Sequence, residues 1–229
     1  MIFGGFQKTD LINFPGKIAS TVFTRGCNFR CPYCHNPEFV IQGSDQTYFG
    51  ETYAEEEILG YLKKRSAFID GLVVSGGEPT LHNDLPDFIR KVRELGLMVK
   101  LDTNGSRPGV LAALLEEGLL DYVAMDIKAP LKKYHLLGFD STEFIEESIK
   151  LLNNSKIDHE FRTTCARAII ADDDFIKMAA ILDPDAKWNL QPFNPAKTLD
   201  PAFTSETTWS ADELTKIAAS LGRKNTFVR

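Results

Sequence analysis

The chain has few cysteines, no long apolar run and no excess of positive charge, and each shortage excludes a class of protein. Four cysteines in 229 residues, with no secretory signal, argue against a disulfide-stapled domain. No apolar run approaches the ~20 residues of a membrane-spanning helix, and Met1–Gly4 is too short for a signal peptide. The formal charge of −6 argues against general polyanion binding, so no nucleic-acid partner is expected. We therefore predict a cytoplasmic protein, outside any membrane, with reduced thiols.

What the sequence does contain is a regular alternation of strand and helix patterns. Short apolar or β-branched runs predict strands, and amphipathic stretches closed by glycine predict helices. Capping boxes at Thr52–Glu55 and Ser210–Glu213 predict the starts of two helices. The strands are predicted within residues 16–26, 71–75, 97–101, 122–125, 160–168 and 188–191, and the helices within 52–65, 84–95, 108–117, 142–153, 174–182 and 210–222.

Six strand–helix units without a repeat or long linker predict an α/β fold with a mostly parallel sheet wrapped by helices. A closed barrel has eight such units in ~250 residues. The prediction is therefore an open (β/α)6 partial TIM barrel in one domain, residues 1–229, with a doubly wound open sheet as the alternative. Both folds bind ligands at the C-terminal ends of their strands, where the unusual residues of this chain gather.

Three of the four cysteines fall within eight positions, as Cys27, Cys31 and Cys34, with the spacing C-x3-C-x2-C. A structural zinc site needs four closed ligands, and the remaining Cys165 is distant in sequence. A 4Fe–4S cluster is normally held by four cysteine thiolates. Three thiolates would leave one iron open to bind a reacting molecule, by the logic that separates catalytic from structural metal sites.

This spacing, with Tyr33 just before the third cysteine, resembles the signature of radical S-adenosylmethionine enzymes. In that family the open iron binds the amino and carboxylate groups of the cofactor's methionine part. His35-Asn36 and the segment Lys8–Lys17 resemble anaerobic ribonucleoside-triphosphate reductase activating proteins, close to pyruvate formate-lyase activating enzyme. The resemblance weakens after about Asn194. It implies a radical S-adenosylmethionine domain in which Cys27, Cys31 and Cys34 hold a catalytic 4Fe–4S cluster.

Gly76, Gly77 and Glu78 follow the strand predicted at 71–75. Two glycines at a strand end permit close approach to the backbone, and a carboxylate can accept hydrogen bonds from an ammonium group. These residues resemble the family's Gly-Gly-Glu motif, which implies that they bind the amino group of the cofactor's methionine. A tight turn with a solvated glutamate is the alternative.

Polar residues also follow the next two predicted strands. Carboxylates and a hydroxyl in one pocket can bind a hard cation, and the neighbouring polar groups can bind a cofactor. The resemblance implies a monovalent cation held by Asp102, Thr103 and Asp126, with Asn104 and Lys128 contacting S-adenosylmethionine. The alternative for each charged residue is a salt bridge that stabilises a strand end.

Several single residues admit two interpretations. Tyr33 either contacts the adenine of the cofactor, as the resemblance implies, or packs its own loop. Arg162 needs an anionic partner in a core strand, which is either the cofactor carboxylate or an internal carboxylate. Cys165 is best interpreted as a small buried hydrophobe. Relatives often carry a histidine near Asn194, and residues 195–208 form either a lid or a simple connection.

The implied activity is reductive cleavage of S-adenosylmethionine to form a glycyl radical on a partner, most plausibly anaerobic ribonucleotide reductase, in an oxygen-poor setting. Flavodoxin or ferredoxin is the implied reductant. One alternative is a radical enzyme that modifies a small molecule, a peptide or RNA. Another is a plain iron–sulfur or zinc module, in which His35 or Cys165 would complete the ligand set.

Overall fold

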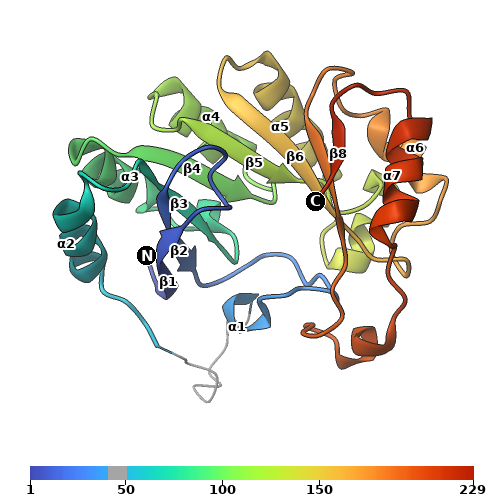
Figure 1. The fold of residues 1–229 in the computed structure, drawn as a ribbon, viewed down its shortest axis with the longest axis horizontal. Helices are drawn as coiled ribbons and strands as arrows, with labels where there is room; N and C mark the ends of the chain where they lie inside the picture. The colour runs from blue at the N-terminus through green and yellow to red at the C-terminus, as the bar shows by residue number, and fades with distance from the viewer. Residues whose placement is uncertain (41–50) are drawn as a thin grey trace. The chain divides into compact units, whose positions relative to one another are not determined.

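A computed structural model describes residues 1–40 and 51–229 (Figure 1). Its strands are β1 (Phe3–Asp10), β2 (Ala19–Thr24), β3 (Gly71–Gly76), β4 (Met98–Thr103), β5 (Tyr122–Asp126), β6 (Asp158–Cys165), β7 (Trp188–Pro192) and β8 (Thr226–Val228). They follow the order β1 to β8 in an eight-stranded sheet. β1 runs antiparallel to β2, and the pairs β2–β3, β3–β4, β6–β7 and β7–β8 are parallel. The predicted α/β class with an open, mostly parallel sheet is confirmed.

The helices alternate with the parallel strands, as the sequence pattern predicts. The α-helices are α1 (Pro37–Val40), α2 (Glu55–Arg65), α3 (Leu85–Glu94), α4 (Pro108–Glu116), α5 (Thr142–Asn154), α6 (Asp174–Ala179) and α7 (Ala211–Ser220). Short 3-10 helices occupy η2 (Pro79–Leu81), η3 (Leu131–Leu137) and η4 (Pro201–Ser205). The short helix α1 and the 3-10 helices lie in stretches that the sequence pattern leaves as loops.

Two of the eight strands, β1 and β8, lie outside the six predicted ones, and both are at the ends of the strand order. β1 contains Gly4 and Gly5 and an exposed polar run, Gln7–Thr9, so it shows neither an apolar run nor a strict alternation. β8 has three residues, none of them buried. Edge strands need little apolar surface, which is why the pattern does not reveal them.

The chain divides into two compact units, and its path alternates between them. The first unit comprises residues 1–28, 38–103 and 109–123, and the second comprises residues 29–37, 104–108 and 124–229. The prediction of one domain across residues 1–229 stays a prediction.

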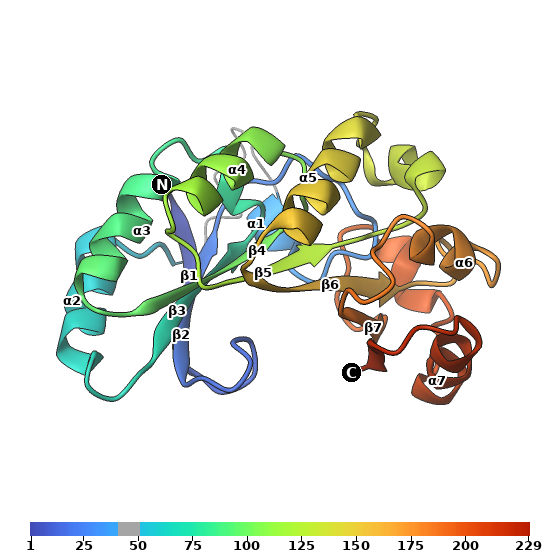
Figure 2. The same ribbon diagram turned by 90° about the horizontal axis from the view of Figure 1, so that it is seen from above.

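In the first unit, buried parallel strands carry helices on one face (Figure 2). Leu72, Val73 and Val74 of β3 are completely buried, as expected for a strand covered on both faces. α3 buries a stripe of side chains at helical spacing, namely Leu85, Phe88, Ile89 and Val92. α3 packs on β4 and on α2, so this stripe joins the helices to the sheet.

In the second unit, β6, β7 and β8 carry α7 against β7 and β8. Trp188 is completely buried, and its indole N–H donates a hydrogen bond to the Thr163 hydroxyl (2.9 Å). α7 begins with the predicted capping box, in which the Ser210 and Glu213 side chains each bond the other's backbone N–H. This prediction is confirmed.

The other predicted capping box is wrong. Helix α2 begins at Glu55, and its N-cap residue Ala54 has no side-chain hydrogen bond. The reason lies just before it, where the backbone N–H of Tyr53 donates to the Phe3 carbonyl (3.1 Å) in a β-bridge. Because residue 53 is tied to an extended strand, the helix cannot begin at Thr52.

Candidate functional site

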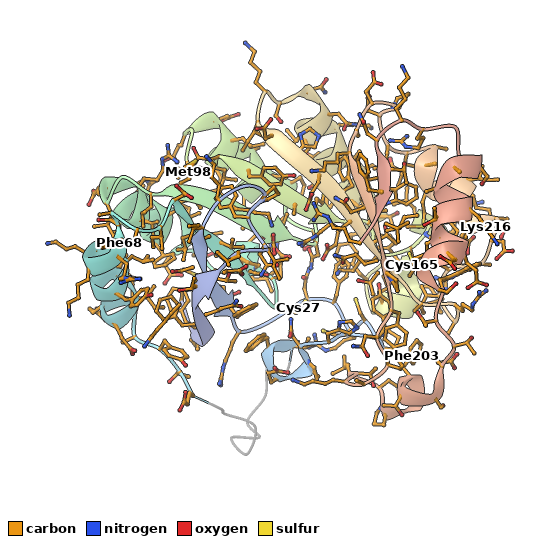
Figure 3. All side chains as sticks on the ribbon, viewed as in Figure 1. Cys27, Phe68, Met98, Cys165, Phe203 and Lys216 are labelled. Atoms are coloured by element: carbon orange, nitrogen blue, oxygen red, sulfur yellow. The ribbon has the colours of Figure 1, made fainter. Side chains whose placement is uncertain are left out.

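Cys27 follows β2 in the first unit (Figure 3). Two backbone hydrogen bonds join the residues before it to the end of β3 and the residues that follow it. The N–H of Gly77 donates to the Thr24 carbonyl (2.8 Å), and the N–H of Glu78 donates to the Gly26 carbonyl (2.8 Å). A Cβ added at Gly77 would lie 2.1 Å from the Gly26 oxygen. The close approach that the glycine pair permits is therefore made to the protein's own cysteine-bearing loop, residues 26–37 (the cysteine loop).

The Glu78 carboxylate is completely buried and takes part in a hydroxyl network within the first unit. Its Oε1 accepts hydrogen bonds from the Thr80 N–H (3.1 Å), the Thr80 hydroxyl and the Thr103 hydroxyl (2.8 Å). A charged acceptor with several short bonds is strongly fixed in orientation. The alternative of a solvated glutamate in a simple turn does not agree with this burial.

Asp102 lies at the end of β4, and its carboxylate forms an ion pair with the ammonium group of Lys100. The Lys100 side chain is completely buried and lies over the ring of Tyr122, with Nζ 5.8 Å from the ring centroid. The sequence singled out Asp102 and missed Lys100. The available signal was the spacing of two on one strand, which places both side chains on the same face.

In the second unit, the cysteine loop is fastened to the end of β5 and to η3. The Cys34 N–H donates to the Cys31 carbonyl (3.0 Å), and the Arg30 N–H donates to the Leu137 carbonyl (2.6 Å). The Tyr33 hydroxyl donates to the backbone carbonyl of Lys128 (3.2 Å). This hydrogen bond joins the cysteine loop to the residues that follow β5.

Asp126, at the end of β5, forms an ion-pair triad with Lys128, two residues further on, and with Arg162 inside β6. The Asp126 carboxylate accepts from Lys128 Nζ (3.0 Å) and from Arg162 Nε (3.1 Å). Arg162 therefore has an internal anionic partner, which was one of its two predicted interpretations.

The charged groups of this triad shift one another's pKa values and keep one another ionised. Burial alone would raise the pKa of Asp126, but Lys128 and Arg162 outweigh it and hold that pKa below its usual value. Burial alone would lower the pKa of Lys128, but Asp126, and then Cys31 and Tyr33, hold it well above its usual value. The Lys128 ammonium is thus a fixed positive charge in the surroundings of Cys31.

Tyr134 is a completely buried residue of η3 that sequence reasoning missed. Its hydroxyl oxygen accepts a hydrogen bond from the Lys128 N–H (3.2 Å), and burial raises its pKa well above the usual value for tyrosine, so it stays protonated. Lys128 is therefore held by Tyr33 at its carbonyl and by Tyr134 at its N–H. No feature of the sequence near Tyr134 marks this role.

Asn104 is a buried turn residue of the second unit, and its side-chain oxygen accepts a hydrogen bond from the Ser106 N–H (2.9 Å). Gly105, between them, has a φ of +75°, and an added Cβ would lie 2.1 Å from the Met125 methyl group. The turn after β4 is thereby packed against Met125 of β5.

The remaining candidates of the second unit lie near the cysteine loop or in the core. The His35 ring packs on Phe193, with centroids 5.8 Å apart, and burial lowers the pKa of His35. The Asp200 N–H donates to the Pro32 carbonyl (2.9 Å), so the 195–208 stretch contacts the cysteine loop. Cys165 is completely buried in β6 (Figure 3), as its interpretation as a small hydrophobe predicts.

The predicted site residues fall into two sets. The first unit carries Cys27, Gly76, Gly77, Glu78, Asp102 and Thr103, and the second carries Cys31, Tyr33, Cys34, Asn104, Asp126, Lys128 and Arg162. Within the described part of either unit, no group of three or more His, Cys, Asp or Glu side chains could hold a metal ion by itself.

Comparison with known proteins identifies the family of this chain. The model of the radical SAM superfamily matches residues 21–177, which include the cysteine loop and the ends of β3 to β6. The chain belongs to the radical SAM superfamily. The predicted family is confirmed, and the chain is therefore an enzyme of this class, whose cofactors are a 4Fe–4S cluster and S-adenosylmethionine.

Relatives place this radical SAM enzyme near the activating enzymes. It is 31% identical over 206 residues to a Methanocaldococcus jannaschii protein provisionally named glycyl-radical enzyme activating enzyme MJ1227, covering 87% of this chain and 82% of that one. It is 33% identical over 127 residues to the pyruvate formate-lyase-activating enzyme of Clostridium pasteurianum, covering 53% and 50% of the two chains. QueE of Escherichia coli shares the fold, with a TM-score of 0.56, 14% identity and coverage of 99% and 92%.

The donor groups of this radical SAM enzyme fit its cofactors. All four cysteines are thiols rather than disulfides, and thiolates are the ligands of iron–sulfur clusters. Cys27 and Cys34 are half-buried and Cys31 is buried, whereas Cys165 donates a hydrogen bond to the Thr163 carbonyl (3.4 Å).

None of the helices in residues 1–40 and 51–229 is long and apolar enough to cross a membrane.

Proposed function

We propose that this radical SAM enzyme generates a glycyl radical on a partner enzyme, and that the partner is anaerobic ribonucleoside-triphosphate reductase. The observation that carries the first part is the similarity to MJ1227 across most of both chains. The second part is supported by the segment Lys8–Lys17 and by His35-Asn36, which resemble the reductase-activating branch. Flavodoxin or ferredoxin is the proposed reductant.

In this proposal Cys27, Cys31 and Cys34 would hold the 4Fe–4S cluster at which S-adenosylmethionine would be cleaved. When bound, the two cofactors supply a 5′-deoxyadenosyl radical, so the demanding chemistry is theirs and the protein provides orientation and a dry pocket. The Lys128 ammonium, whose pKa is held above its usual value by Asp126 and then by Cys31, would favour thiolate over thiol at Cys31.

The contacts proposed for S-adenosylmethionine come from the strand-end residues named above. Gly76, Gly77 and Glu78 would hold the methionine amino group, and the bonds from Thr80 and Thr103 support a fixed carboxylate for that purpose. Asn104, Lys128 and Arg162 would contact the carboxylate and ribose, and Tyr33 would contact the adenine. The mutual pairing of Asp126 with Lys128 and Arg162 supports a rigid set of donors.

The first experiment tests the radical chemistry. The enzyme is reconstituted anaerobically with iron and sulfide, reduced, and supplied with S-adenosylmethionine, and methionine and 5′-deoxyadenosine are measured. Cleavage is expected in the parent enzyme and should be lost in Cys31→Ala. Cys165→Ala is the matched control, because it removes a buried thiol outside the triplet and should retain cleavage. Equal cleavage in Cys31→Ala and the parent would contradict the assignment of the cluster ligands.

The second experiment tests the partner. The reduced enzyme is mixed with anaerobic ribonucleotide reductase and S-adenosylmethionine, and the electron paramagnetic resonance spectrum of the reductase is recorded. A glycyl-radical doublet that requires all components supports the proposal. Cleavage that proceeds without any reductase radical would overturn the partner, and a small molecule, peptide or RNA substrate would then be sought.

A further inference from the structure

Lys100 is an unusual residue for the middle of a sheet. It lies in β4, is paired in register with Val73 of β3, and its side chain is 0% exposed. An ammonium ion loses strong hydration when it is buried, and this loss is tolerated when a carboxylate and further polar or aromatic groups replace the water. The groups around Lys100 therefore indicate the role of its positive charge.

Two groups in the first unit face the Lys100 ammonium. Asp102, two residues further along the same face of β4, forms the ion pair, and its side chain is 11% exposed. The Tyr122 ring lies beneath, with Nζ 5.8 Å from the centroid, within the range of a cation–π contact. The ammonium is thus held at the strand end by a carboxylate and an aromatic face.

The family resemblance implies a monovalent cation at Asp102, Thr103 and Asp126, but the Asp102 carboxylate already contacts an ammonium group. A metal ion bound to the same carboxylate would lie within a few ångströms of that ammonium, where two like charges repel strongly in a buried setting. The residues present at Asp102 therefore do not fit a bound Na⁺ or K⁺.

We propose that the Lys100 ammonium is the built-in cation of this strand end and takes the place of the monovalent metal ion. Asp102 is then neutralised permanently, whatever salt surrounds the protein. Two consequences follow for the reconstituted enzyme. It binds no Na⁺ at Asp102, and its cleavage of S-adenosylmethionine is the same in sodium, potassium and choline chloride.

The test is a ²³Na NMR titration of the reconstituted, oxidised-state enzyme, with potassium as competitor. The parent enzyme is expected to show no saturable line broadening that potassium reverses. Lys100→Met keeps the length of the side chain and removes its charge, so it should gain such a site at Asp102. In choline chloride this variant should melt about 10 °C lower than the parent, because a buried charge has lost its partner. Sodium should recover part of that difference.

The controls separate this role from a general effect of lysine loss. Lys91→Met removes the lysine of an exposed pair with Glu55, and it should gain no sodium site. The double variant Lys100→Met/Asp102→Asn removes both charges, and it should neither bind sodium nor depend on it for stability.

Two results would overturn the proposal. The first is saturable sodium binding by the parent enzyme that disappears in Asp102→Asn, and it requires no Lys100 variant. The second is a folded Lys100→Met variant that binds no sodium. The NMR readout involves neither the partner enzyme nor radical formation, so failure of the proposed function would leave this test unaffected.

Discussion

At the scale of single residues, the cysteines differ sharply in their surroundings. Cys27 and Cys34 are half-buried in or beside the cysteine loop, whereas Cys165 is enclosed in β6. Burial raises the pKa of Cys165 to about 12, although a backbone hydrogen bond from Gln191 acts in the opposite direction. Because the thiolate is the reactive form, this thiol is chemically inert in the native protein.

We predict that iodoacetamide does not label Cys165 of the native enzyme at pH 9 but labels it readily in urea. Burial limits access, and at pH 9 the raised pKa lowers the thiolate fraction about five-hundredfold below that of an ordinary cysteine. The measurement is mass spectrometry of the peptide that contains Cys165. Labelling at the same rate in native and unfolded protein would contradict the burial.

The same pKa shift has a consequence for stability. Above pH 9 the unfolded chain releases the Cys165 proton while the native state keeps it, so the unfolded state binds fewer protons. The contribution of this group to the free energy of unfolding therefore decreases as the pH rises from about 9 to about 12. Cys165→Ala should lack this part of the pH dependence.

Two glycines with opposite surroundings give a second prediction. A Cβ at Gly77 would lie 2.1 Å from the Gly26 oxygen, whereas Gly60, in helix α2, has open space at that position. Gly77→Ala is expected to destabilise the enzyme by about 3 kcal/mol, because backbone must move. Gly60→Ala should stabilise it by about 0.5–1 kcal/mol through helix propensity. Urea unfolding of both variants checks this, and equal effects would contradict the packing of the β3 end.

What could be predicted at this scale depended on how far apart the partners lie in the chain. The cysteine triplet and the strand-end motifs are local patterns, and the sequence alone reveals them. The contact between Tyr33 and Lys128 joins residues 95 positions apart, and no local pattern indicates it. Lys100 was missed for another reason, since its partner Asp102 was considered without the residue two positions before it.

At the scale of elements, the buried strands were predictable because burial on both faces demands apolar runs, as in β3. The edge strands β1 and β8 were not, because the hydrogen bonds of an edge place little demand on side chains. Helix starts were predictable where local chemistry decides them. Where a tertiary contact intervenes, as between Tyr53 and Phe3, the same four-residue motif does not start a helix.

This contrast between two capping motifs can be measured. Ser210→Ala should lower the free energy of unfolding by about 1 kcal/mol, because the N-cap hydrogen bond of α7 is lost. Thr52→Ala should change it by less than about 0.5 kcal/mol, because Thr52 is exposed and lies outside α2. Chemical unfolding followed by circular dichroism provides both values. Similar losses for the two variants would show that Thr52 does cap the helix.

At the scale of the whole molecule, the cysteine triplet is divided between the units, since Cys27 belongs to the first and Cys31 and Cys34 to the second. In the proposed cluster all three thiolates are ligands, so unfolding around any one of them releases the cluster. We predict that the visible absorbance of the cluster disappears in the first urea transition, whether circular dichroism shows one transition or two. Absorbance that survives a first loss of helical signal would place all the cluster ligands in a single unit.

The hydrogen bond between Tyr33 and Lys128 also has a consequence for the synthesis of the protein on the ribosome. A ribosome adds about 5–20 residues per second, so about 5–20 seconds separate the synthesis of these two partners, which lie 95 residues apart. Throughout that interval the nascent chain contains Cys27, Cys31 and Cys34, but β5 and Lys128, to which their loop is later bonded, have not been completed. A cluster on the fastened loop therefore forms only after Lys128 has been synthesised, and oxygen met before then reaches the thiols while their loop is unfastened.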